Sequence, residues 1–251
     1  MFSNKYIFTY ASVMVILVAA ILSSASMLLK PYQEANVKAE KIQGILASAN
    51  VTTDRDQAAN TYQQHIVEEL AVDSEGNVVS RYRNDSLVEG DVRPFDIDIK
   101  EALIRNQAIK RGESAEAPLW PVFVLEKDGE KYYIVPVRGV GLWGPIWGNI
   151  AFESDFNTIA GATFDHKGET PGLGAEINTS WFEDEFKGKT IFDEQGKFVS
   201  VNVVKGGAGE NAPHAVDAIS GGTITSNGVK DMLLTGLDNY VPYIKKNNNN
   251  E

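Results

Sequence analysis

Residues 121–137 read Pro-Val-Phe-Val-Leu-Glu-Lys-Asp-Gly-Glu-Lys-Tyr-Tyr-Ile-Val-Pro-Val. Two runs rich in β-branched and aromatic residues, Val122–Glu126 and Lys131–Val137, flank the turn Lys127-Asp128-Gly129, which predicts an antiparallel hairpin. Working outward, we expect further strands at Ile66–Val72, Val78–Tyr82, Asn149–Ser154, Asn157–Asp165 and Lys197–Val204. Helices are expected at 53–64, 98–111, 179–186 and 225–237, with the rest of 84–116 in loops. Strands grouped apart from helices indicate an α+β domain built on antiparallel sheet.

The N-terminal segment is apolar enough to cross a membrane. Tyr6–Leu29 contains no charged residue and is bracketed by Lys5 and Lys30. As a helix it would reach about 36 Å, slightly more than the ~30 Å hydrocarbon core of a bilayer. A cleaved signal peptide is the alternative, since residues 24–26 are small enough for a peptidase, but the run is long for such a peptide. We therefore predict a retained single transmembrane anchor.

The chain divides into four predicted parts. Residues 1–30 form the anchor, and 31–120 form a helical stalk and the start of the soluble domain, because Tyr32–Ser48 has a helical composition. Residues 121–243 form the main domain. The asparagine-rich end, 244–251, is predicted to be a disordered tail.

Composition excludes several classes of function. The 251 residues carry a net charge of −11 and include no cysteine. An acidic surface argues against a nucleic-acid partner, and the lack of thiols excludes disulfides, thiolate metal sites and iron–sulfur ligation. The three histidines are widely spaced, so we expect no metal site. A hydrolase lacks support because no Gly-x-Ser-x-Gly elbow is present.

A glycine-rich stretch follows the hairpin. Residues 139–144 fit Gly-x-Gly-x-x-Gly, but a dinucleotide fold needs a helix directly afterwards, and Pro145-Ile146-Trp147 leads into a strand instead. The simple interpretation is a loop with core tryptophans. The functional one is a loop that presents Trp143 to a flat aromatic ring.

Two further segments combine glycine with polar groups. Residues 169–174, Glu-Thr-Pro-Gly-Leu-Gly, form a turn by composition, which is either a plain surface turn or a display of a carboxylate, a hydroxyl and backbone N–H groups to a ring edge. Lys205-Gly206-Gly207 ends a strand; by itself, Lys205 is typical of a solvated charge.

The most informative motif is Asp-Ala-Ile-Ser-Gly-Gly-Thr-Ile-Thr at 217–225. Its serine and glycines leave the backbone open to a phosphate, and its two threonines supply hydroxyls. Thr225 lies where a helix is predicted to begin, and free N–H groups and the positive dipole end at such a terminus stabilise a phosphate. The alternative is a helix N-cap preceded by a glycine turn.

Four segments in this order resemble the C subunit of the sodium-translocating NADH:quinone reductase: Gly141-Leu142-Trp143, 169–174, Lys205-Gly206-Gly207 and 217–225. The single N-terminal membrane helix and the chain length also fit that family, and the resemblance covers most of 122–243. The last segment resembles the family's flavinylation motif, Ser-Gly-Ala-Thr-x-Thr. It departs from that motif at Gly222, where the family usually has alanine.

The resemblance implies an electron-carrying subunit with FMN joined through its phosphate to Thr225. It implies no catalytic residue for NADH or quinone on this chain. The expected flavin-binding residues are Leu142, Trp143, Glu169, Thr170, Leu173, Gly174, Lys205, Ser220, Gly221, Gly222, Thr223 and Thr225. A flavin transferase would recognise Asp217, Ser220, Gly221 and Thr223.

The resemblance also implies partners and a location. We expect the other subunits of the reductase, the transferase during maturation, and the lipid bilayer through one helix. The soluble domain would lie on the periplasmic side of a bacterial inner membrane.

Two alternatives remain at this point. The G subunit of the Rnf-type ferredoxin:NAD reductase shares the flavinylation motif and a similar topology. A protein of another class, a membrane-anchored binding or scaffold module without flavin, would use residues 217–225 only as a helix cap.

Overall fold

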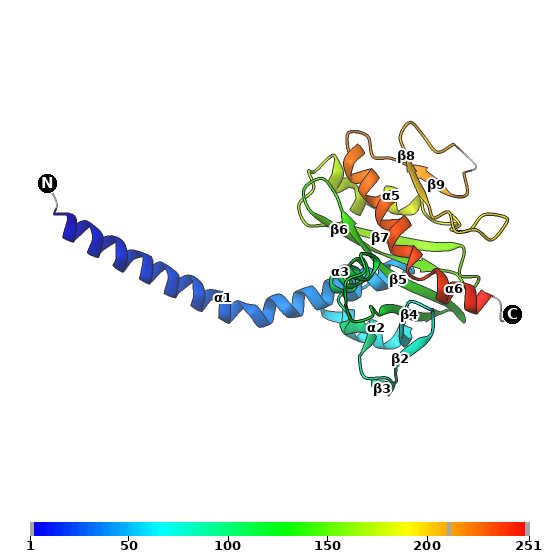
Figure 1. Cartoon of the computed structure of the whole chain (residues 1–251), viewed down its shortest axis with the longest axis horizontal. Coiled ribbons are helices and arrows are strands. Elements are labelled where there is room, and N and C mark those ends of the chain that lie inside the picture. The colour runs from blue at the N-terminus through cyan, green and yellow to red at the C-terminus, as the bar shows by residue number, and fades with distance from the viewer. Residues whose placement is uncertain (1–2, 210–211, 249–251) are drawn as a thin grey trace. The chain divides into compact units, whose positions relative to one another are not determined.

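The computed structural model describes residues 3–209 and 212–248 and contains two compact units, Met1–Lys41 and Ile42–Glu251 (Figure 1). Helix α1 (Asn4–Ser48) forms the first unit and contributes its last turns to the second. Within the described residues, α1 is the one helix long and apolar enough to cross a membrane, and its most apolar window has a mean hydropathy of 2.4 with no buried residue. The predicted anchor and stalk helices are thus one helix that continues through Pro31.

The second unit is organised by a seven-stranded sheet whose neighbouring strands are all antiparallel. Its strand order is β3-β2-β1-β4-β5-β6-β7. The predicted hairpin is confirmed as β4 and β5, with Phe123 opposite Ile134 and Lys127 opposite Glu130. The strands are β1 (Ile66–Val72), β2 (Val78–Arg83), β3 (Ser86–Glu89), β4 (Trp120–Lys127), β5 (Glu130–Val140), β6 (Pro145–Phe152) and β7 (Ile159–His166).

Shorter elements surround this sheet. A parallel pair of short strands joins β8 (Asn202–Val204) to β9 (Ala215–Asp217). The α-helices after α1 are α2 (Ala58–His65), α3 (Ile99–Lys110), α4 (Ser180–Asp184), α5 (Thr223–Asp238) and α6 (Val241–Asn248). The 3-10 helices are η1 (Arg55–Gln57), η2 (Pro94–Asp96) and η3 (Gly174–Asn178). Asp98 caps α3, because its carboxylate accepts the N–H of Lys100 at 2.8 Å.

Four expectations about elements are wrong in detail. The strand predicted at 197–204 is confined to β8, because Ser200 has a φ of +59° and cannot continue an extended strand. The tail predicted to be disordered from residue 244 is helical through Asn248, since Ile244 is buried in the core; residues 249–251 lie outside the described part. Strand β3 lies where the sequence predicts a loop, and α5 begins two residues before Thr225.

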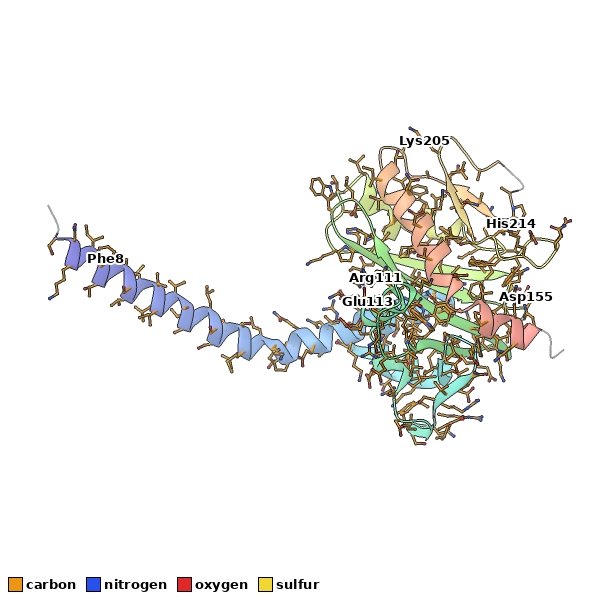
Figure 2. The ribbon with its side chains drawn as sticks, viewed as in Figure 1. Phe8, Arg111, Glu113, Asp155, Lys205 and His214 are labelled. Atoms are coloured by element: carbon orange, nitrogen blue, oxygen red, sulfur yellow. The ribbon has the colours of Figure 1, made fainter. Side chains whose placement is uncertain are left out.

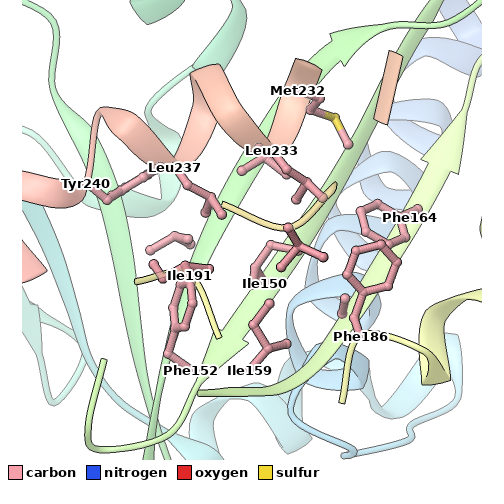
Figure 3. Close-up of a cluster of buried hydrophobic side chains, with 14 of the residues drawn as sticks. Ile150, Phe152, Ile159, Phe164, Phe186, Ile191, Met232, Leu233, Leu237 and Tyr240 are labelled. Atoms are coloured by element: carbon pink, nitrogen blue, oxygen red, sulfur yellow. The ribbon is translucent and has the colours of Figure 1, made fainter. Parts of the chain in front are cut away.

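The main core lies between α5 and one face of the sheet. Leu233 and Leu237 of α5 point toward Ile150 and Phe152 of the sheet, and Met232 of α5 belongs to the same cluster (Figure 3). Phe186 and Ile191, from the segment after α4, complete the cluster. Burying each such side chain contributes about 1.5–3 kcal/mol, so this cluster fixes α5 on the sheet.

Glycines let α5 approach β5 closely. A Cβ at Gly228 of α5 would collide with the carbonyl oxygen of Val140, and one at Gly139 of β5 would lie 2.6 Å from Cβ of Met232. Farther along α5, a Cβ at Gly236 would lie 3.0 Å from Cγ1 of Val137. This contact brings the first turns of α5 beside the loop that joins β5 to β6.

Candidate functional site

The N-terminus of α5 begins from a tight glycine turn. Gly221 has a φ of +76°, a conformation that favours glycine, and the N–H of Gly222 donates to the carbonyl of Ile219 at 3.0 Å. Ser226 Oγ accepts the N–H of Ile219 at 3.1 Å, which closes the turn. Gly222 is the N-cap and provides no side-chain cap, so the N–H groups of the first helical turn have no acceptor within the helix.

Thr225 lies in this first turn and is buried. It is 1% exposed, and its Oγ1 donates to Oε2 of Glu169 at 2.5 Å. Glu169, which is 4% exposed, also accepts the backbone N–H of Trp143 through Oε1 at 2.8 Å. The backbone N–H of Glu169 donates to Nδ1 of His166 at 3.1 Å. One carboxylate therefore joins α5 to the β5–β6 loop.

Two glycines make room for this carboxylate. A Cβ at Gly141 would lie 2.6 Å from Oε1 of Glu169, and a Cβ at Gly174 would collide with Oγ1 of Thr225. The β5–β6 loop is closed by the N–H of Gly141, which donates to the carbonyl of Gly144 at 2.8 Å. Three predicted segments, 141–143, 169–174 and 220–225, thus meet around the Glu169–Thr225 pair.

Apolar side chains near the pair are left exposed. Trp143 is 67% exposed, and Leu142, Leu173 and Ile224 are exposed as well. Leu173 covers the glycine turn, since a Cβ at Gly221 would lie 2.6 Å from its Cδ2. Exposed aromatic and aliphatic groups beside a helix N-terminus suit a ligand with a flat ring and an anionic group.

The residue that follows the fourth predicted segment, Ala208, is bonded to the motif residue Asp217. Asp217 Oδ1 accepts the N–H of Ala208 at 2.6 Å, and the N–H of Asp217 donates to Oε2 of Glu185 at 2.6 Å. Burial, followed by the charge of Asp217, raises the pKa of Glu185. Asp217 therefore holds the loop that begins at Lys205.

Lys205 is exposed in the loop after β8 (Figure 2). Within 3–209 and 212–248, no hydrogen bond or ion pair links it to Glu169 or Thr225. Thr170 is also exposed, and its carbonyl accepts the N–H groups of Leu173 and Ala175 at 3.1 Å. Ser220 is exposed in the glycine turn, and Thr223 is the first residue of α5. The flavin contacts of all four residues stay predictions.

Sequence reasoning missed three supporting residues, His166, Glu185 and Ser226. Each one bonds a backbone N–H of a motif segment, namely that of Glu169, Asp217 and Ile219 respectively. Ser226 directly follows Thr225, and this adjacency was the one available signal. His166 and Glu185 become recognisable only when the fold brings their elements to the motif.

The comparisons with known proteins match this geometry. An FMN-binding domain family matches residues 141–238, which include the meeting segments. The C subunit of the Na(+)-translocating NADH-quinone reductase from Neisseria meningitidis is 33% identical over 91% of this chain and 88% of that protein. The same subunit from Vibrio vulnificus is 34% identical over 84% of this chain and 81% of that protein. This chain belongs to the family of C subunits of the Na(+)-translocating NADH-quinone reductase.

Solved structures of this C-subunit family share the fold. The crystal structure from Parabacteroides distasonis is 42% identical, with a TM-score of 0.71, over 86% of this chain and 96% of that one. The Shewanella oneidensis structure is 29% identical, with a TM-score of 0.65, over 83% of this chain and 98% of that one. The predicted family and α+β architecture are confirmed.

Membership in the C-subunit family fixes the class of function. The chain is an electron-carrying flavoprotein subunit of a multi-subunit enzyme, the sodium-translocating NADH-quinone reductase, and FMN is its cofactor. These findings favour the sodium enzyme over the Rnf-type alternative and over a scaffold without flavin.

Proposed function

We propose that FMN is held covalently, as a phosphate ester of Thr225, and relays electrons between neighbouring subunits. The observation that carries this proposal is the position of Thr225 in the uncapped first turn of a 16-residue helix that opens from a glycine turn. The positive end of the helix and its free N–H groups stabilise a phosphate there. Flavin supplies the ability to accept and donate electrons singly or in pairs.

The surrounding residues suit the rest of the cofactor. Leu142, Trp143 and Leu173 present exposed apolar surface that can pack against an isoalloxazine ring. Attachment through the phosphate leaves that ring chemically unchanged. Lys205 follows β8, which packs against α5, so its charge can lie near an anionic flavin once the loop adjusts.

The same proposal includes location and maturation. Helix α1 is retained as a single-pass anchor in the bacterial inner membrane, and the soluble domain lies in the periplasm. A flavin transferase recognises Asp217, Ser220, Gly221 and Thr223. Asp217 supports this step by holding the 205–209 loop in place through Ala208. The remaining subunits of the reductase supply the electron donor and acceptor.

The first prediction tests the covalent bond. The full chain, co-expressed with a flavin transferase, should gain the mass of FMN minus one water and fluoresce in a denaturing gel. Thr225→Ala should show neither change, because it lacks the hydroxyl. Thr235→Ala is the matched control, since it removes an exposed hydroxyl from the same helix, where Oγ1 bonds only the carbonyl of Asp231.

Two results would contradict the proposal. An unmodified wild-type chain beside an active transferase would leave the motif as a helix cap, and flavin would then be bound without a covalent link or not at all. A mass gain that persists in Thr225→Ala would place the ester on another residue, and peptide mapping would identify it.

A further inference from the structure

The hydroxyl at which the proposed ester forms is already bonded to a carboxylate of this chain. Thr225 Oγ1 donates to Glu169 Oε2 at 2.5 Å, and both side chains are almost fully buried. No salt bridge to Glu169 occurs among the residues that the structure describes. A carboxylate that contacts a buried hydroxyl within hydrogen-bond reach has the geometry of a general base.

Glu169 is fixed in this position from several sides. Trp143 N–H holds Oε1, and the backbone of Glu169 bonds to His166. Gly141 and Gly174 leave no space for a Cβ beside the carboxylate. Such a supported side chain is pre-organised, which is what a base needs to act without reorganisation.

From this geometry we propose that Glu169 is the general base for its own chain's flavinylation; the inference rests on the proposed ester at Thr225. Direct condensation with FMN would have to expel water, so the donor is a flavin dinucleotide, in which the FMN phosphate already carries a leaving group. Thr225 Oγ bonds to the phosphorus of the FMN half, and the pyrophosphate P–O bond to the adenylate breaks. The hydroxyl proton moves to Glu169, and from there to the released phosphate or to water.

The 169–174 turn has a buried base and an exposed tip. The tip of the turn, residues 170–173, is exposed, whereas Glu169 at its base is buried and anchored. Leu173 at the tip covers the glycine turn in front of Thr225. The proposal therefore requires the tip to move aside for the dinucleotide while Glu169, held by Trp143, stays in contact with the hydroxyl.

The second prediction is that Glu169→Gln lowers the rate of flavinylation by about 100-fold or more, the usual contribution of general base catalysis. Glutamine keeps the size of the side chain and an oxygen that accepts from Thr225 or Trp143, but it does not take the proton. Rates are measured from intact mass over time, with purified full chain in detergent, a flavin transferase and flavin adenine dinucleotide. Glu169→Asp should recover part of the rate.

A pH profile separates this role from a structural one. The ratio of the wild-type rate to the Glu169→Gln rate should fall as pH is lowered, because only the wild-type chain carries a carboxylate beside Thr225, whereas the transferase affects both chains equally. Glu194→Gln is the control, because it neutralises an exposed carboxylate outside the 169–174 turn. It should modify at the wild-type rate.

The outcomes distinguish the two proposals. Equal rates for wild type and Glu169→Gln, or a ratio that does not change with pH, would overturn the base role and leave the ester intact. A wild-type chain that is never modified would overturn the ester and the base role together. Thermal melting of each variant shows whether a lost rate reflects loss of the fold.

Discussion

At the scale of single residues, Glu183 shows how one side chain completes the exposed edge of the sheet. Strand β7 is the last in the order, and the N–H of Phe164 in it donates to Oε1 of Glu183 at 2.7 Å. Burial, assisted by Asp184 and Asp165, raises the pKa of Glu183 to about 7, although the N–H of Phe164 and Lys187 act the other way. The carboxyl group is therefore close to half ionised at neutral pH.

The third prediction follows from that pKa. Because it is raised from 4.5 on folding, the protonated group favours the folded state, and its contribution to stability is complete below about pH 4.5 and lost as pH rises through 7. Glu183→Gln should remove this loss, since its amide oxygen still accepts from Phe164. We expect the variant to gain about 1–2 kcal/mol over wild type between pH 5 and 8, a value discounted for partial solvent exposure.

Urea denaturation at several pH values measures this difference. Wild type should lose stability across the range more steeply than the variant. The same slope in both proteins would show that Glu183 ionises normally. Glu194→Gln, which neutralises an exposed carboxylate that is not among the charges acting on Glu183, controls for a general change in surface charge.

Gly222 can also be judged at this scale. Its φ is −101°, which suits any residue, and an added Cβ would lie 2.9 Å from Cγ2 of Ile219. Alanine, which the family usually has here, would fit after a shift of a few tenths of an ångström. The departure from the motif thus changes packing beneath the turn and leaves the backbone of the glycine turn as it is.

At the scale of elements, the position of α5 depends on its contact with β5. Gly228 lies against the carbonyl of Val140, and Gly139 lies against Met232. The fourth prediction is that Gly228→Ala destabilises the domain by about 1–3 kcal/mol through overpacking, even after the gain in helix propensity of about 1 kcal/mol. Gly168→Ala is the matched control, because its Cβ would meet nothing and its φ is ordinary.

Chemical denaturation of both variants gives the comparison. Gly168→Ala should unfold at the wild-type denaturant concentration, and Gly228→Ala at a lower one. If Gly228→Ala were as stable as wild type, the backbone of β5 would have to shift at Val140 to accommodate the methyl group. The close contact would then not determine the position of α5.

Elements with a regular pattern could be predicted from the sequence, and the exceptions have physical causes. The β4–β5 hairpin consists of two runs of β-branched and aromatic residues around an Asp-Gly turn, and α3 begins directly after Asp98. Strand β3 has four exposed residues and so carries no alternation of buried and exposed positions. The segment before β8 reads as a strand, but the left-handed conformation of Ser200 interrupts it.

The sequence predicts which segments form the candidate site, but not how these segments are arranged in space. The motif residues predict a phosphate-binding turn, since glycine and hydroxyl residues before a helix suit that chemistry. The bond between Glu169 and Thr225 joins residues 56 positions apart and depends on how closely α5 approaches β5. This close contact between α5 and β5 is possible because Gly139 and Gly228 have no side chains. The hydropathy of a sequence does not reveal such a contact.

At the scale of the whole molecule, the compact second unit begins inside α1, at Ile42. Ile42, Ile45 and Leu46 are buried in it. The carbonyl of Gly44 accepts Oγ1 of Thr163 at 3.0 Å, and Gln43 donates to the carbonyl of Thr53 at 2.8 Å. The last turns of α1 are therefore part of the folded domain.

The fifth prediction concerns truncation. Residues 42–251 should fold cooperatively without the anchor, because they keep every one of these contacts. Residues 50–251 should be less stable by about 5 kcal/mol or more, since three buried aliphatic side chains are lost at about 1.5–3 kcal/mol each. Unfolding of the two fragments in guanidinium tests this prediction. Equal unfolding midpoints would show that residues 42–49 add no stability to the domain.

The glycine contact between α5 and β5 has a consequence for how the chain tolerates mutation. In a saturation library selected only for folding, positions 139 and 228 should accept almost nothing but glycine, because any larger residue meets Met232 or the carbonyl of Val140. Thr225 is buried and its hydroxyl bonds Glu169, so in that library it should accept small residues other than threonine but not large ones. A library selected for retained flavin should restrict all three positions. Comparing the residues tolerated in the two libraries would distinguish Gly139 and Gly228, which determine the position of α5, from Thr225, which is proposed to carry the flavin.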